Sequence, residues 1–331
     1  MECNSCNFPI GEKETVKECE ACGKHVHVFC LITKGEQKVC DLCYIKETEE
    51  KPSYSFELPE HIRRTHIETY RKCPNKFKLE VLEDRPQPQR PYTQVGIDLH
   101  EIFEKAVKDR TYTHEQRVND YVNNYVPQQV EQGIFESEEE QASYLKRAMD
   151  SLQHFDLILP SIPKPYMIEE TLTFEIDKNL PKVSFTMDLV TENANGGLDL
   201  VDWKTGKELV GKQLASDLQA PIYIHGVQQH TGRRVDSFTF YYLRENKVRK
   251  FERVDNDTFV CTVGKREYFI RLHETVGELQ GLFTQIKKGN FSVPNDSKGM
   301  FFTCKMCHLK DDGLCLGADQ QAWFQLNGGN Q

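Results

Sequence analysis

Residues Val183 to Lys207 read VSFTMDLVTENANGGLDLVDWKTGK, and no other stretch of the chain says as much about its fold. Apolar and polar side chains alternate from Val183 to Leu189, which is the pattern of a half-buried strand. Asn193 to Gly197 form a predicted turn, and Leu198 to Lys204 form a second predicted strand. The stretch therefore predicts a β-hairpin within an α/β domain.

This hairpin brings two acidic residues together. If it is centred on Asn195, Asp188 lies seven residues before the centre and Asp202 seven after it, so the two carboxylates face each other to within a residue or two. Paired carboxylates suit a hard divalent cation such as Mg²⁺ or Mn²⁺. Lys204, beside them, can orient or deprotonate a water molecule that attacks phosphorus. The hairpin thus predicts metal-dependent phosphodiester hydrolysis.

Motifs around the hairpin resemble those of PD-(D/E)XK superfamily nucleases of the RecB type. Asp202 to Gly206 is similar to the D-x-K-T-G signature of these enzymes. Upstream, Gly96 to His100 resembles their G-x-x-x-H helix motif, and downstream, Gln219 to Tyr223 resembles their Q-x-x-x-Y motif. Phe185 is a departure, because the family usually has glycine three residues before the first acid.

The resemblance implies a role for each matched residue. The metal ligands would be His100, Asp188, Asp202 and the Trp203 carbonyl. The catalytic residues would be Asp188, Asp202, Lys204, Gln219 and Tyr223, with the last two supporting the lysine and the substrate strand. Glu170 precedes the first strand of the hairpin and is interpreted as a strand-edge charge, so it is not included in the site.

Cysteines beyond the N-terminal region suggest a second metal centre. Tyr70 to Phe77 reads YRKCPNKF and resembles the Y-x-x-C-P-x-x-F element of AddB and of CRISPR-associated RecB-like exonucleases. In those proteins one early and three late cysteines hold a [4Fe–4S] cluster. The ligands implied here are Cys73, Cys304, Cys307 and Cys315. A zinc ion on the same four cysteines is the alternative, and Cys261 is interpreted as a small core residue.

The first 45 residues are expected to form a zinc finger. A gap of two residues lets both thiolates of a pair reach one ion, and eight ligands therefore predict two Zn²⁺. Their order resembles the cross-brace of PHD and RING fingers. The expected ligands are Cys3, Cys6, Cys19, Cys22, His27, Cys30, Cys40 and Cys43. His25 is a rival to His27 for one of these positions.

Composition sets limits on the whole chain. It has 331 residues, 12 cysteines and a formal charge of −9, which argues only weakly against nucleic-acid binding because local basic surface decides affinity. No apolar run approaches 18 residues and the first ten residues do not resemble a signal peptide. The expectation is an intracellular protein, cytoplasmic or nucleoid-associated, without membrane contact.

The predicted organisation is a zinc finger at 1–45, a charged linker at 46–60 and a PD-(D/E)XK domain at 61–331. This last domain is expected to be α/β, with a mixed central sheet flanked by helices, as in restriction endonucleases. Helices are predicted near 62–72, 98–108, 114–155, 211–230 and 264–288, and strands within 166–203 and at 235–243 and 247–254. Asp98 and Glu101 are expected to cap the second helix.

The function predicted from the sequence is a metal-dependent DNA nuclease. The resemblance implies an exonuclease that acts on single-stranded ends in recombination, repair or CRISPR-adaptation-like processing, with the finger available to a protein partner. One alternative is an adaptor built around the zinc finger. The other is a protein that binds DNA without cutting it, an option that Phe185 leaves open.

Overall fold

The structure is a computed structural model that describes residues 16–27, 31–34, 37–40, 58–291, 307–311 and 315. The chain divides into two compact units, residues 1–58 with 277–289 and residues 59–276 with 290–331. In the first unit, β1 (Val16–Glu18) pairs with β2 (His25–His27), and β3 (Leu31–Lys34) pairs with β4 (Gln37–Cys40).

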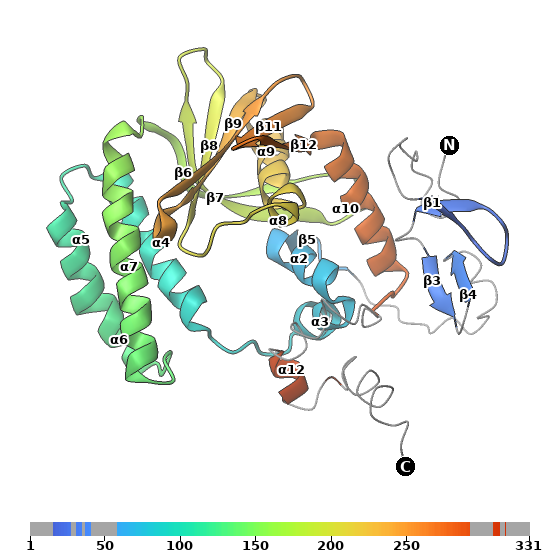
Figure 1. Cartoon of the computed structure of the whole chain (residues 1–331), viewed down its shortest axis with the longest axis horizontal. Helices are drawn as coiled ribbons and strands as arrows, with labels where there is room; N and C mark the ends of the chain where they lie inside the picture. The colour runs from blue at the N-terminus through green and yellow to red at the C-terminus, as the bar shows by residue number, and fades with distance from the viewer. Residues whose placement is uncertain are drawn as a thin grey trace. The chain divides into compact units, whose positions relative to one another are not determined.

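The second unit is built on an eight-stranded sheet with the order β12-β11-β10-β9-β8-β7-β5, in which β6 also pairs with β7 (Figure 1). The β5–β7 and β8–β9 pairs are parallel and the others are antiparallel, so the predicted mixed sheet is confirmed. Its strands are β5 (His61–Arg63), β6 (Pro165–Phe174), β7 (Lys182–Glu192), β8 (Leu198–Lys204), β9 (Val235–Tyr242), β10 (Lys247–Arg253), β11 (Thr258–Val263) and β12 (Arg266–Arg271).

Helices flank this sheet. They are α2 (Arg64–Lys72), α3 (Pro74–Phe77), η2 (Lys78–Leu82), α4 (Pro91–Lys108), α5 (His114–Asp120), η3 (Tyr121–Tyr125), α6 (Val126–Glu131), α7 (Glu138–Ile158), η4 (Leu159–Ser161), α8 (Lys212–Ala215), α9 (Gln219–Thr231), η5 (Leu243–Glu245), α10 (Leu272–Lys287) and α12 (His308–Asp311). None of the helices in the described part of the chain is long and apolar enough to span a membrane.

Aromatic packing fixes the helices next to the site. Phe103 of α4 stacks on Phe155 of α7, with ring centroids 4.4 Å apart, and both rings lie edge-on to Trp203 of β8. All three side chains are almost completely buried. On α9, His225 stacks on Phe174 of β6 at 5.0 Å. The strands that carry the acidic residues are thus held against both α4 and α9.

The helix predicted for 98–108 begins seven residues earlier, at Pro91. Proline suits the first turn of a helix because its missing N–H has no partner there in any case. Asp98 therefore lies inside α4, and the predicted capping pair is wrong. The buried Asp98 carboxylate instead accepts hydrogen bonds from the side-chain amides of Gln94 and Gln129.

Two other predicted helices are shorter than expected. The segment from 264 begins with the turn at Gly264, whose φ is 63°, and with strand β12, so helix α10 starts only at Leu272. The segment from 211 is split into α8 and α9. Pro221 explains the restart of the helix at Gln219, because proline is tolerated only in the first turn. The predicted β9–β10 hairpin around Asn246 is confirmed.

Candidate active site

Strand pairing places Asp188 and Asp202 side by side. Strands β7 and β8 are antiparallel, and their last register pair, Leu189 with Val201, makes Asp188 and Asp202 the next pair along. The backbone N–H of Trp203 donates a hydrogen bond to Asp188 Oδ2 at 2.6 Å. The two acidic residues are only 6% and 2% exposed. The hairpin geometry expected from the sequence is therefore present.

Lys204 is held by two neighbours. Its Nζ lies 2.6 Å from Asp202 Oδ2 and donates to Gln219 Oε1 at 2.6 Å. The Gln219 amide in turn donates to Asp202 Oδ1. Gln219 occupies the first turn of α9, where Asp217 Oδ1 accepts its backbone N–H at 2.7 Å. Lysine, acid and amide thus form a closed ring of one ion pair and two hydrogen bonds that fixes the lysine.

Tyr223 lies one turn beyond Gln219 on α9. Its ring stacks on Phe185 with centroids 4.6 Å apart, and Phe238 lies edge-on to it. Burial raises the pKa of Tyr223 well above its ordinary value, so the phenol stays neutral. The ring of Phe185 is buried between β7 and α9, where a Cβ on Gly226 would lie 2.3 Å from it. Phe185, which stands where the family usually has glycine, is therefore accommodated by packing against α9.

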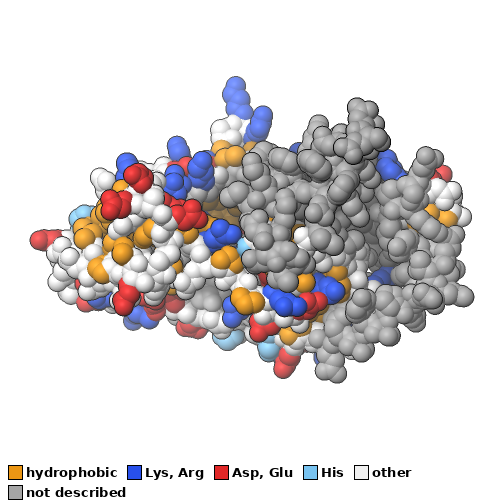
Figure 2. Space-filling view, turned by 90° about the horizontal axis from the view of Figure 1, so that it is seen from below, with side chains coloured by type: hydrophobic (Ala, Val, Ile, Leu, Met, Phe, Trp, Pro, Cys, Tyr) orange, Lys and Arg blue, Asp and Glu red, His pale blue; other side chains and the backbone are white. Residues whose placement is uncertain are grey.

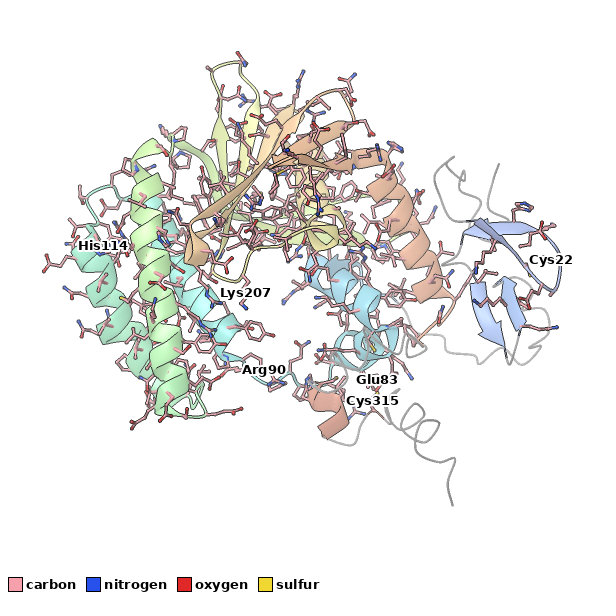
Figure 3. The ribbon with its side chains drawn as sticks, in the orientation of Figure 1. Cys22, Glu83, Arg90, His114, Lys207 and Cys315 are labelled. Atoms are coloured by element: carbon pink, nitrogen blue, oxygen red, sulfur yellow. The ribbon has the colours of Figure 1, made fainter. Side chains whose placement is uncertain are left out.

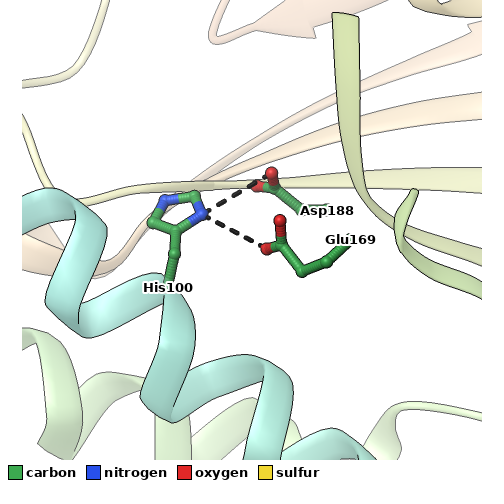
Figure 4. A group of neighbouring side chains, drawn as sticks. All are labelled: His100, Glu169 and Asp188. Carbon is green, nitrogen blue, oxygen red and sulfur yellow. Dashed lines mark ion pairs between the residues drawn. The ribbon is translucent and has the colours of Figure 1, made fainter. Parts of the chain in front are cut away.

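His100, Glu169 and Asp188 converge from three different elements. The Nδ1 atom of His100, on α4, lies 3.6 Å from Glu169 Oε1 and 3.5 Å from Asp188 Oδ1 (Figure 4). One ligand atom from each of the three residues lies within 4.8 Å of the others, so the group could hold a metal ion. Histidine nitrogen with carboxylate oxygen is a donor set that suits Mn²⁺ and accepts Mg²⁺.

Glu169 is a residue that the sequence analysis missed, having considered only its neighbour Glu170. On β6, Ile168 pairs with Leu189 and Glu170 with Met187, so Glu169 stands across from Asp188. Its φ of 49° is left-handed, which is unusual for a glutamate inside a strand and is typical of functional sites. Only the pairing of β6 with β7 distinguishes Glu169 from Glu170, and no local pattern in the sequence reveals that pairing.

Electrostatics show that the buried carboxylates of the site favour nearby positive charge. Burial, together with the charge of Asp188, outweighs the nearby Lys204 ammonium and raises the pKa of Asp202 to about 6. Burial disfavours a charged His100, but Asp188, Glu169 and Asp202 outweigh it and raise the pKa of His100 to about 10. Glu169 Oε1 is buried without a hydrogen-bond partner among the described residues. A divalent cation would satisfy this surplus of negative charge, so the residues present fit one.

Three of the four cysteines expected to bind iron come together. Burial raises the pKa of the Cys73 thiol, and nearby Cys315 and Cys307 raise it further. The backbone N–H of Lys76 donates to Cys73 Sγ at 3.4 Å, and the Asn75 amide donates to Cys315 Sγ at 3.2 Å. Figure 3 shows Cys315 near the α3 and η2 segment. Cys304 lies outside the described residues.

Half of the predicted zinc ligands also lie outside the described residues. Of the eight, the side chains of Cys19 and Cys22 are described, the first buried and the second exposed. The backbone turns tightly between them, since Gly23 N–H donates to the Cys19 carbonyl at 2.7 Å with a φ of 67°. The other predicted ligands, for whose side chains there is no description, are Cys3, Cys6, His27, Cys30, Cys40 and Cys43.

Fold and site together define a class of protein. A mixed sheet carries buried acids and a tethered lysine on adjacent strands, and the helix next to them adds a histidine, which makes a site for a divalent cation. The chain belongs to the PD-(D/E)XK nuclease superfamily, whose sequence profile matches residues 64–311. All the residues of the candidate site lie within this range, and a nuclease superfamily implies nucleic acid as the substrate.

Other comparisons are more distant. The crystal structure of SSO0001 is 12% identical in sequence, and the similarity covers 83% of this chain and 95% of that one with a TM-score of 0.32. No curated protein matches this chain.

Proposed function

We propose that the protein is a metal-dependent deoxyribonuclease whose metal is held by His100, Glu169, Asp188 and Asp202. The observation that carries the proposal is the convergence of three ligand atoms within 4.8 Å, next to a lysine that is tied down by hydrogen bonds. The Trp203 carbonyl remains a predicted further ligand. When bound, a divalent cation would stabilise the negative charge that develops on a phosphodiester.

The chain's own residues would perform the remaining work. Lys204 would orient the attacking water and take up or return its proton, because Asp202 and Gln219 fix its Nζ in one position. Gln219 links the lysine to the acid, so its role is positioning. Tyr223, neutral and packed on Phe185, would support α9 beneath Gln219. Non-cleaving and adaptor functions are disfavoured, because a protein with either function does not need this arrangement.

The test is cleavage of end-labelled DNA with Mg²⁺, with Mn²⁺ and with EDTA. Lys204→Ala should lower the rate by about 10²- to 10⁴-fold, the usual contribution of general acid–base groups, and keep the wild-type secondary structure by circular dichroism. Lys247→Ala, which removes an exposed lysine at the start of β10, is the matched control and should cut normally. Full cleavage by Lys204→Ala would overturn the assignment.

Exonuclease action on single-stranded ends is a finer proposal that rests on the motif resemblance. Linear and circular single strands of the same sequence separate the possibilities, because a circle offers no end. We expect the linear strand to be degraded and the circle to persist. Labels at the 5′ and 3′ ends then report the polarity of degradation. Rapid cleavage of the circle would show endonuclease action instead.

We also propose that Cys73, Cys304, Cys307 and Cys315 hold a [4Fe–4S] cluster. Cys307 and Cys315 lie near enough to Cys73 to raise the pKa of its thiol, which supports a shared metal centre. The motif resemblance favours the cluster, and zinc on the same four thiolates is the alternative.

Metal analysis tests this cluster and the zinc finger together. Anaerobically purified protein should contain about four iron atoms and about two zinc ions per chain. Three zinc ions and no iron would assign the C-terminal cysteines to zinc. The absence of zinc would exclude the two-ion finger, and with it the proposal that the finger recruits a protein partner.

A further inference from the structure

One face of helix α4 is buried at one end and open at the other. Tyr92, Gly96, Leu99 and Phe103 share this face, because they are spaced by four, three and four residues. Leu99 and Phe103 are 1% and 0% exposed, whereas Tyr92 is 67% exposed. Single exposed apolar residues are common on proteins, but this one continues the stripe that packs on the sheet. The first turn of helix α4 thus extends beyond the hydrophobic core and exposes the ring of Tyr92.

The open end of this face lies beside the loop that follows the catalytic lysine. A Cβ added to Gly96, one turn from Tyr92, would lie 3.4 Å from Thr205 Oγ1, and Thr205 directly follows Lys204. The same loop carries the exposed Lys207, and Arg90 directly precedes α4. Figure 3 shows Arg90 and Lys207 at this end of α4. The end of α4 that carries the exposed tyrosine therefore also has two cationic side chains, one from the residue before the helix and one from the loop after Lys204.

The distance from the metal-binding group suits a polynucleotide. Tyr92 lies eight residues before His100 on the same helix, a separation of about 12 Å. A strand with one phosphate at the metal group would reach Tyr92 within roughly two to four nucleotides, since stacked nucleotides rise by about 3.4 Å. Figure 2 shows the molecule from below, where basic side chains lie beside apolar ones.

We propose that Tyr92 stacks on a base of the substrate strand while Arg90 and Lys207 bind its phosphates, so that the protein selects single-stranded DNA. An aromatic ring between cations is how proteins hold single strands without reading their sequence. In a duplex the base faces are covered by neighbouring pairs, so the ring has nothing to stack on. This inference rests on the proposed nuclease function and adds the feature of the substrate that is recognised.

The experiment compares two single-stranded oligonucleotides, one normal and one with abasic sites over the four nucleotides next to the scissile bond. Wild-type protein should cut the normal strand about tenfold more efficiently, as expected for one stacked base. Tyr92→Ala should lose this preference by slowing only on the normal strand, and Tyr92→Phe should keep it. Leu157→Ala, which truncates a side chain on α7 that is 65% exposed, is the matched control and should behave as wild type.

Fluorescence anisotropy with the same labelled strands is measured in parallel, so that binding is tested even without cleavage. Tyr92→Ala should bind the normal strand more weakly and the abasic strand equally well. If wild-type protein binds and cuts both strands alike, or if Tyr92→Ala matches wild type, the Tyr92 proposal is wrong and the nuclease assignment stands. If no DNA is cut under any metal condition, the nuclease proposal fails, and the anisotropy data alone decide whether Tyr92 holds a strand.

Discussion

The candidate metal group and the cysteine group both bring together residues that are far apart in the sequence, but they are positioned differently. His100, Glu169 and Asp188 lie on a long helix and two paired strands, each fixed by backbone hydrogen bonds and packing. Cys73 lies between two helices, and Cys307 and Cys315 lie on short described stretches joined by one backbone hydrogen bond, from Cys315 N–H to the Leu309 carbonyl.

This difference indicates what each group needs from its metal. The acidic residues are placed by the sheet, so the fold should survive without a divalent cation, which contributes chemistry. The predicted cysteine ligands come from the beginning and the end of the domain. A cluster there would contribute stability, because binding a metal that only the native state can hold favours folding.

The largest expected effect is on catalysis. Asp188→Asn removes the charge that faces both His100 and Glu169, and cleavage should fall by at least about a thousandfold. The melting temperature without metal should stay the same or rise, because buried like charges are relieved. Asp150→Asn, on the exposed side of α7, is the control. A marked loss of stability in Asp188→Asn would mean that the acidic residues hold the fold together as the cysteines are expected to.

The second effect is on stability. Cys73→Ala should lose iron and lower the melting temperature by roughly 5–15 °C, the range expected when a cross-link between the ends of a domain is removed. Absorbance of the anaerobic protein and thermal unfolding measure the two outcomes. Cys261→Ala, which alters a buried thiol of β11, should keep its iron. Full iron content in Cys73→Ala would remove this residue from the ligand set.

A smaller effect separates two neighbouring glutamates. Glu169→Gln should weaken Mn²⁺ binding and slow cleavage by about 10- to 100-fold, as does the loss of one partner of a metal site. Glu170→Gln should leave both unchanged, because the alternation of β6 directs it away from Asp188. Calorimetric titration with Mn²⁺ measures the affinities. Equal losses in both variants would show that general negative charge, not the position of Glu169, attracts the cation.

The smallest effect is on how the stability of the fold depends on pH. Burial against Phe174 lowers the pKa of His225, on the α9 helix that carries Gln219, so the unfolded state binds this proton more readily. Stability should therefore fall as pH drops below about 6.5, the ordinary histidine pKa. His225→Gln should flatten the dependence of melting temperature on pH between 5 and 7, by on the order of 1–3 °C. An unchanged pH dependence would show that other groups cause it.

The sequence predicted those parts of the site that depend on local geometry. The turn at Asn195 fixed the pairing of Asp188 with Asp202, and helical spacing put Gln219 and Tyr223 one turn apart. Glu169 could not be predicted in this way, because its position depends on the pairing of β6 with β7 and on a left-handed backbone.

The predicted starts of two helices were also wrong, and each error has a physical reason. Apolar spacing alone suggested that α4 starts near residue 98, whereas Pro91 begins it, and the buried Asp98 is satisfied by side-chain amides that are distant in sequence. Strand β12 was mistaken for the first part of a long helix. Its alternation is masked by charged residues at both ends of β12, Arg266 and Arg271.

The left-handed backbone of Glu169 lowers the stability of the fold, whereas its carboxylate serves the proposed metal site. A glutamate at a φ of 49° costs on the order of 1–3 kcal/mol, a strain that glycine would relieve. A lineage released from the need to cut nucleic acid could therefore gain a more stable fold by one substitution at this position. Related chains that keep the carboxylate would be those still under selection for metal binding. Glycine or asparagine at residue 169 would indicate chains that have kept the fold and lost the activity.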